Sequence, residues 1–143
     1  MIFIERPADF KPWFEVAACL CEWNGKILLL KRLEGKFEGG KWGAPGGKMD
    51  PGETVLEAVT REIKEETNID LQEDQIKSVQ TFLVRAGDKD LVYHLHRATF
   101  EQLPEVTLNP NEHTEFRWVT LDESFTLPLV HDMEECLRTV YER

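Results

Sequence analysis

Two apolar segments open the chain, and a short polar turn separates them. Residues 13–32 read WFEVAACLCEWNGKILLLKR, which places apolar runs on both sides of Asn24-Gly25. This dipeptide suits a type I′ turn because both of its residues tolerate positive φ. The pattern therefore predicts an antiparallel strand pair whose second strand ends near Lys31 and Arg32.

The next segment, residues 33–54, breaks this apolar pattern. Its sequence, LEGKFEGGKWGAPGGKMDPGET, is too rich in glycine and proline for regular structure over most of its length. We expect a long loop here. Long loops inside small domains usually carry function, so this segment is the first candidate for a functional site.

A helical pattern follows the loop, with apolar residues at spacings of three and four. Thr54 and Glu57 form a capping-box pattern at its start. Asn68 suits its end because asparagine tolerates the left-handed conformation that closes many helices. The sequence predicts a helix from about Val55 to Thr67.

The second half of the chain alternates between strand-like and helical patterns. Residues 76–86, 90–103 and 114–123 have the alternating or clustered apolar positions typical of strands, and the sequence GDKD forms the turn between the first two. Residues 127–143 have an amphipathic helical pattern. Strands mixed with two helices favour a layered α+β or α/β domain, with the helices on opposite or adjacent faces of a sheet.

Length and composition are those of an ordinary globular protein. The 143 residues fit one domain, residues 1–143, and 41% of them are hydrophobic. No apolar run approaches the roughly 20 residues of a membrane helix. The first residues lack the basic leader and sustained apolar region of a secretion signal. We expect a cytoplasmic protein that neither spans a membrane nor anchors to one.

Net charge limits the partners of the chain. The formal charge is −10 at pH 7, and no basic patch is visible in the sequence. Proteins that bind nucleic acids usually carry such a patch to neutralise phosphates. We therefore expect no nucleic acid polymer as a partner, and we expect any phosphate-bearing ligand to bind together with a divalent cation.

Cysteine and histidine residues offer weaker candidates for chemistry. Cys19 and Cys21 lie two apart in a predicted strand, where neighbouring thiols rarely bridge, so we interpret them as reduced core residues. His94 and His96 alternate along one strand, but no third soft ligand accompanies them. We interpret both as packed or exposed strand residues, and Trp42 as a residue that packs within its loop.

Acidic residues are concentrated on the predicted helix. The spacing of Glu62, Glu65 and Glu66 lets all three converge on one edge of it. Glu66 falls on the apolar face, where a carboxylate is costly, and neither Glu62 nor Glu66 has a Lys or Arg three or four residues away. A solvated face with salt bridges through Arg61 is the alternative interpretation. The adjacent glycine-rich loop favours a site.

Carboxylates beside the backbone carbonyls of a glycine loop form a set of hard oxygen ligands. Such a set suits Mg²⁺, with Mn²⁺ as the alternative, and does not suit metals that prefer sulfur or imidazole. A cation in this position neutralises phosphate oxygens and activates water. The pattern points to hydrolysis of a phosphoanhydride.

The segment GGKMDPGETVLEAVTREIKEETNI, residues 46–69, resembles the Nudix box. The pattern of that box is Gly, five residues, Glu, seven residues, then Arg-Glu-apolar-any-Glu-Glu-any-Gly-apolar. Every specified position matches except Asn68, which stands in place of glycine. The resemblance implies a Nudix-type α/β/α sandwich around a mixed central β-sheet. It also implies metal-dependent hydrolysis of nucleoside diphosphates linked to another moiety.

The resemblance further implies roles for residues inside the box. Glu53 pairs with Arg61 and holds the loop to the helix, a role that is either structural or catalytic. Glu65 is a catalytic candidate as well as a ligand. The metal ligands that the resemblance implies are Glu62, Glu65, Glu66 and the Gly46 carbonyl.

Outside the box, Glu112 matches the later acid that serves many family members as a metal ligand or general base, and Glu115 is the alternative. Arg32 and Lys48 match basic residues near the phosphates in MutT-type enzymes, which hydrolyse nucleoside triphosphates. The alternative for each of these two is an exposed surface charge.

Substrate preference is inferred by elimination. The residue marks of ADP-ribose and diadenosine polyphosphate enzymes are absent around Val84 and Arg85. We therefore expect a small nucleotide, either a nucleoside triphosphate or a modified nucleotide, that yields a monophosphate and pyrophosphate. The alternatives are a nucleotide-sugar or dinucleotide pyrophosphatase, such as an ADP-ribose hydrolase, and a non-catalytic nucleotide-binding regulator. A homodimer also fits the resemblance.

Overall fold

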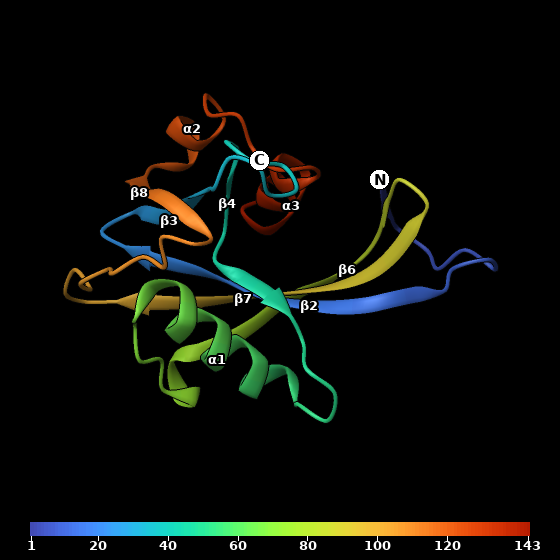
Figure 1. The fold of residues 1–143 in the computed structure, drawn as a ribbon, viewed down its shortest axis with the longest axis horizontal. Helices are drawn as coiled ribbons and strands as arrows, with labels where there is room; N and C mark the ends of the chain where they lie inside the picture. Colours follow the sequence, from blue (N-terminus) through green and yellow to red (C-terminus); the bar gives the residue numbers. More distant parts are fainter.

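A curled mixed β-sheet with helices on both faces forms the centre of the computed structural model, which describes residues 1–143 (Figure 1). The strands are β1 (Ile2–Phe3), β2 (Pro12–Trp23), β3 (Lys26–Arg32), β4 (Trp42–Gly43), β5 (Gly46–Lys48), β6 (Ile76–Ala86), β7 (Lys89–Phe100) and β8 (His113–Val119). The helices are α1 (Val55–Thr67), α2 (Leu121–Ser124) and α3 (Met133–Val140), with a 3₁₀ turn at Glu73–Gln75.

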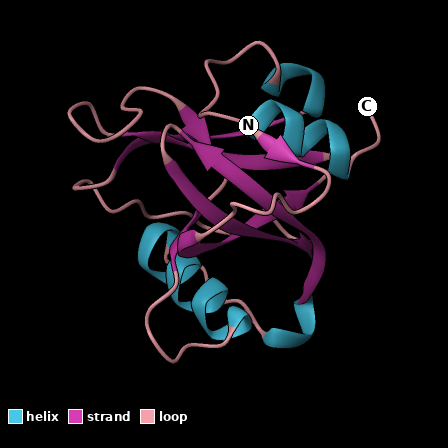
Figure 2. Ribbon diagram, turned by 90° about the vertical axis from the view of Figure 1, so that its right-hand side faces the viewer, coloured by secondary structure: helices cyan, strands magenta, loops and turns pink.

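The main path through the sheet is β1-β6-β7-β2-β3-β4, while β5 pairs with β2 and β8 pairs with β3. β2 and β7 run parallel, and the other strand pairs are antiparallel. Helix α1 lies on one side of the sheet, and α2 and α3 lie on the other (Figures 1 and 2). The predicted α/β/α arrangement around a mixed sheet is confirmed.

Strand β2 connects two hydrophobic cores. Ala17 and Cys19 belong to the core under α1, whereas Ala18 and Leu20 belong to the core under α3. Successive side chains of a strand point to opposite faces, so a strand covered by helices on both faces is apolar at every position. The continuous apolar run AACLC follows from this double burial.

The Asn24-Gly25 turn forms as predicted, with φ of 51° and 73° at its two residues. The predicted antiparallel pair is confirmed, with the second strand ending at Arg32, but the pairing is short. β2 and β3 pair only at Glu22↔Ile27 and Trp23↔Lys26, next to the turn. Farther on, β2 pairs with β5 and β7, and β3 pairs with β8 and β4. The two strands separate because each finds a different partner, and this opens a space between them.

Helix α1 has the predicted bounds, and both of its predicted ends are confirmed. The Thr54 hydroxyl accepts a hydrogen bond from the Glu57 amide at 3.2 Å, and the Glu57 carboxylate accepts one from the Thr54 amide. Asn68 closes the helix in the left-handed conformation, with φ of 63°. Asparagine therefore keeps the cap geometry that glycine would provide.

The glycine-rich loop and the last helix differ from the prediction. Residues 33–54 contain β4 and β5, which bridge the gap between β3 and β2. The last helix begins only at Met133, because Asp132 directly before it is in the left-handed conformation, with φ of 65°, and Pro128 keeps its own preceding residue out of a helix. Residues 127–130 instead run beside Trp42, whose amide donates to the Pro128 carbonyl at 2.8 Å.

Three smaller predictions can also be compared with the structure. Cys19, Cys21 and Cys136 are buried free thiols, in agreement with reduced core residues. Trp42 is buried within its loop as predicted. None of the helices has the length and apolar character needed to cross a membrane.

Candidate active site

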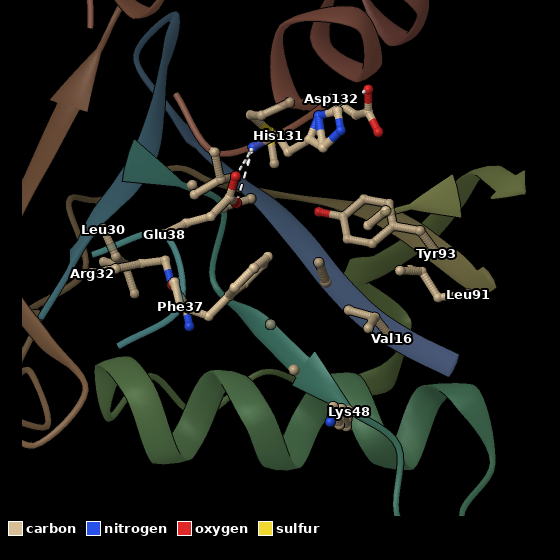
Figure 3. A pocket seen from close by; sticks show the side chains of 18 of the residues that line it. Val16, Leu30, Arg32, Phe37, Glu38, Lys48, Leu91, Tyr93, His131 and Asp132 are labelled. Carbon is tan, nitrogen blue, oxygen red and sulfur yellow. Dashed lines mark hydrogen bonds and ion pairs between the residues drawn. The ribbon is translucent and has the colours of Figure 1, made fainter. Parts of the chain in front are cut away.

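A cavity of about 470 Å³ lies where β2 and β3 separate (Figure 3). Its lining falls into two sets, one polar and one apolar. The polar set contains Arg32, Lys48, Glu62, Glu66, Glu112 and His113. The apolar and aromatic set comes mainly from β2, β6, β7 and α3 and includes Val16, Val84, Leu91, Tyr93 and Met133. The cavity can therefore hold a molecule with one charged end and one apolar end.

Glu66 is the most deeply buried acid in the cavity. Its residue is 2% exposed, and its carboxylate accepts one hydrogen bond, from the Gly46 amide at 2.8 Å. No lysine or arginine forms an ion pair with it. Burial raises the pKa of Glu66 well above its usual value, against the effect of the Gly46 hydrogen bond. A divalent cation would supply the missing positive charge.

Arg61 forms ion pairs with the other three acids of the box. Its guanidinium forms a bidentate pair with Glu53, with Nε 2.6 Å from Oε2 and Nη2 2.9 Å from Oε1. Its Nη1 also lies 2.9 Å from Oε1 of Glu62 and 3.2 Å from Oε2 of Glu65. Hydrogen bonds from Arg61, followed by one from the Asp50 amide, lower the pKa of Glu53 to about 2.

This network corrects one expectation and leaves another open. Glu62 has a cation partner after all, because Arg61 reaches it from the adjacent position rather than from three or four residues away. Burial nevertheless raises the pKa of Glu62. Glu65 is absent from the cavity lining, and its side chain is 55% exposed. Its role as a ligand and catalytic residue therefore stays a prediction.

Two glycines allow the loop to approach the acids closely. A Cβ at Gly47 would lie 2.5 Å from Oε2 of Glu62, so only glycine leaves room for that carboxylate. A Cβ at Gly46 would lie 2.5 Å from the Ala17 carbonyl oxygen of β2. The loop is thus held between α1 and β2, which explains why these positions need glycine.

Glu112 approaches the box from the segment before β8. An oxygen of its carboxylate, an oxygen of Glu66 and a ring nitrogen of His113 all lie within 4.8 Å of one another. Glu115, the alternative to Glu112, instead pairs with Arg117 at 3.3 Å and does not line the cavity. Of the two acids, the structure brings only Glu112 to the box.

His113 was not predicted from the sequence. It opens β8 opposite Arg32 of β3, and its residue is 7% exposed. Burial, and secondarily the charge of Arg32, lower its pKa to about 4, so the ring is neutral at pH 7. The only feature of the sequence that could have pointed to His113 is that it follows Glu112. Its approach to Glu66 becomes visible only when β8 pairs with β3.

Arg32 and Lys48 both line the cavity, as expected for residues that meet phosphates. Arg32 Nε donates to the Phe37 carbonyl at 2.6 Å, which fixes the guanidinium beside the acids. Lys48 Nζ lies 4.4 Å from the centre of the Phe14 ring. Figure 3 shows both side chains at the wall of the cavity. A contact of either residue with phosphate stays a prediction.

The strand histidines are packed as predicted. His96 is buried, and its Nδ1 lies 3.1 Å from the Ala18 carbonyl oxygen. His94 Nε2 lies 2.7 Å from the Glu15 carboxylate. Neither residue lines the cavity.

The residues around Glu66 fit a divalent cation. The site contains the carboxylates of Glu66 and Glu112, which repel one another, and a ring nitrogen of the buried His113 within 4.8 Å of both. Oxygen and imidazole donors at such separations could hold a metal ion. The Gly46 carbonyl is a further candidate donor on the basis of the sequence.

Comparisons with known proteins point to one family. A family model described as the NUDIX domain matches residues 11–141. The chain is 34% identical over 116 residues to the uncharacterized Nudix hydrolase YvcI of Bacillus subtilis, which covers 80% of this chain and 70% of that protein. It is 31% identical over 117 residues to the CTP pyrophosphohydrolase of Escherichia coli, covering 80% of this chain and 82% of that protein.

A solved structure agrees with the sequence comparisons. The MutT Nudix hydrolase from Burkholderia pseudomallei superimposes with a TM-score of 0.78 at 31% identity, over 91% of this chain and 98% of that one. Nudix hydrolases use divalent metal ions and act on small nucleotide substrates. The fold, the box on α1 and these similarities show that the chain belongs to the Nudix hydrolase family and is a pyrophosphohydrolase.

Proposed function

We propose that the protein hydrolyses a nucleoside triphosphate or a modified nucleotide, releasing a nucleoside monophosphate and pyrophosphate, with Mg²⁺ as its cation. The observation that carries the proposal is Glu66, a buried carboxylate without a cation partner at the polar wall of the cavity. The similar CTP pyrophosphohydrolase supports a triphosphate substrate by its name.

The polar lining residues would bind the phosphates, and the apolar lining residues would bind the nucleoside. Arg32 and Lys48 supply positive charge for the phosphates in a chain whose net charge is −10. The apolar set offers Tyr93 and Met133 to the nucleoside. Figure 3 shows Phe37 and Tyr93 pointing into the cavity, where an aromatic ring can pack against a base.

The proposed cation ligands are Glu62, Glu65, Glu66, Glu112 and the Gly46 carbonyl. When bound, the cation neutralises phosphate charge and activates water for attack on phosphorus. Arg61 and Glu53 act by holding the loop against α1, so that the Glu62 carboxylate keeps its place. Glu112 is the proposed general base when it does not serve as a ligand.

The test is a substrate panel with Mg²⁺, in which the products are identified by mass. The panel contains nucleoside triphosphates, modified triphosphates, ADP-ribose and dinucleotides. We expect a monophosphate and pyrophosphate from a triphosphate, and loss of this activity in Glu65→Gln and Glu66→Gln. Asp90→Asn is the matched control, because Asp90 is a buried carboxylate that does not line the cavity.

Three outcomes would contradict the proposal. Turnover confined to ADP-ribose or dinucleotides, with two monophosphates as products, would favour the nucleotide-sugar or dinucleotide alternative. Turnover of no member of the panel would favour a nucleotide-binding regulator. Glu66→Gln activity equal to that of the native protein would remove Glu66 from the reaction.

A further inference from the structure

We propose that His113 supplies an imidazole nitrogen ligand to the divalent cation, next to Glu66 and Glu112, and that the site therefore prefers a first-row transition metal over Mg²⁺. This inference rests on the metal site of the proposed function: Mg²⁺ supports the proposed hydrolysis there, and a transition metal binds the same site more tightly. The sequence predicted oxygen donors alone, and the structure adds a nitrogen donor to them.

One ring nitrogen of His113 forms no hydrogen bond. Nδ1 is the one buried side-chain nitrogen or oxygen atom in the structure that has no hydrogen-bond partner. Buried polar atoms are nearly always paired, so an unpaired one needs a partner that the protein chain itself does not provide. A ring nitrogen of His113 also lies within 4.8 Å of carboxylate oxygens of Glu66 and Glu112, so a cation held by these two acids would have the imidazole beside it.

The other three histidines lack this arrangement. His94 and His96 have hydrogen-bond partners on β2, at Glu15 and Ala18. His131 is half exposed, and its Nδ1 lies 3.4 Å from the Asp132 carboxylate. Only His113 combines burial, an unpaired nitrogen and two acids within reach.

The backbone fixes His113 in place. The amides of Glu112 and His113 both donate to the Asn109 carbonyl at 3.0 Å, and the Leu33 amide donates to the Glu112 carbonyl at 2.9 Å. On the strand side, His113 pairs with Arg32 of β3. A side chain on so constrained a backbone is preorganised to bind a cation. The type of donor atom it offers therefore affects which cation the site selects.

Donor type decides which cation such a site favours. Mg²⁺ prefers oxygen ligands and loses its waters reluctantly. First-row transition metals accept imidazole as well as carboxylate, and they bind mixed donor sets more tightly. Glu66, Glu112 and His113 together form a mixed set, so the site should discriminate against Mg²⁺ through the nitrogen.

The experiment uses Mn²⁺ alone, bound to the full-length protein whose histidine rings are labelled with ¹⁵N. Pulsed electron paramagnetic resonance detects a ¹⁵N nucleus coordinated to Mn²⁺. We expect such a coupling in the native protein, its loss in His113→Gln, and its retention in His96→Gln, the matched buried histidine. Titration should show the Kd for Mn²⁺ rising by about tenfold or more in His113→Gln, with the Kd for Mg²⁺ changing much less.

Each result supports or overturns the assignment. The assignment is overturned by a native spectrum without ¹⁵N coupling, by absence of Mn²⁺ binding, or by equal loss of Mn²⁺ and Mg²⁺ affinity in His113→Gln. If that variant does not fold, as judged by circular dichroism, the native spectrum and His113→Asn decide. Nucleotide hydrolysis with Mg²⁺ that persists in the absence of ¹⁵N coupling would refute this inference alone and leave the proposed function standing.

Discussion

Glu66 on α1 and Asp90 on β7 are two buried carboxylates with opposite surroundings. Asp90 is 4% exposed and forms a bidentate pair with Arg85, at 2.6 Å and 3.1 Å, while the Lys11 amide donates to it at 2.9 Å. Glu66 is 2% exposed and accepts only the Gly46 amide. The two residues are equally hidden from water but differ in their cation partner.

The pKa values follow this difference. Hydrogen bonds from Arg85 lower the pKa of Asp90, whereas burial raises the pKa of Glu66. A charge that is buried and fully paired is a structural feature of a fold. A charge that is buried and unpaired is costly, and it persists where function requires it. Asp90 is thus a carboxylate paired within the fold, whereas the proposed role of Glu66 is to bind a cation.

Among the variants, Glu66→Gln should have the largest effect on activity, and it tests the proposed role of the unpaired carboxylate. Loss of the proposed ligand should lower kcat by about 10³-fold, because metal assistance contributes several kcal/mol to the barrier. The amide oxygen can still accept the Gly46 amide. Enzyme assays at saturating Mg²⁺ measure the loss, and activity within a few-fold of native would contradict the role.

When no metal is bound to either protein, Glu66→Gln should be more stable than the native protein. The folded pKa of Glu66 is raised, so its contribution to stability is present below the unfolded pKa and is lost as pH rises. As pH rises above the unfolded pKa the native protein loses this contribution, whereas glutamine does not titrate and loses nothing. Thermal melts in a chelator should give the higher Tm for Glu66→Gln. A lower Tm would show that the carboxylate stabilises the fold as Asp90 does.

Gly47→Ala should cost about 10- to 100-fold in activity, since its Cβ would displace the Glu62 carboxylate. Metal titration and kcat measurements should both report the loss. Gly52→Ala is the matched control: its φ is +82°, so alanine is strained there, but nothing lies within 4 Å of the added Cβ. If both variants lose activity equally, disturbance of the loop and not contact with Glu62 explains the effect.

Arg61→Lys should reduce the apparent affinity for the metal by about tenfold. A lysine ammonium cannot reproduce the fork that joins Glu53, Glu62 and the Lys48 carbonyl. Arg85→Lys removes the equivalent bidentate pair at Asp90 and should leave metal affinity unchanged. Isothermal titration of both variants tests this, and equal losses would contradict it.

Asp90→Asn should have the smallest effect on activity. Its effect should instead appear in the stability of the fold at acidic pH. Because the folded pKa of Asp90 is lowered, its stabilising contribution is present above the unfolded pKa of about 3.9 and is lost as pH falls. Urea unfolding should therefore show native stability decreasing from about pH 5 downward, with a weaker dependence in Asp90→Asn. An unchanged pH dependence would show that Arg85 does not hold this carboxylate.

Local features of the fold could be predicted from the sequence. The bounds and caps of α1, and the turn at Asn24-Gly25, depend on residues within a few positions of one another. The box on α1 was recognisable for the same reason, because its acids sit on one helix at fixed spacing. The antiparallel pairing of β2 and β3 was predicted correctly, but nothing in the sequence indicated that it covers only two residue pairs, because β5 then pairs with β2 and β4 with β3.

The sequence by itself determined the helix, its carboxylates, the glycines beside them and the family to which they belong. Tertiary structure alone decided which carboxylate lacks a cation, because Arg61 could reach Glu62 but not the buried Glu66. It also brought Glu112, just before β8, and His113, at its start, to that carboxylate from 46 and 47 residues farther along the chain. Burial and approach across a sheet depend on how distant segments pack, and no local pattern encodes them.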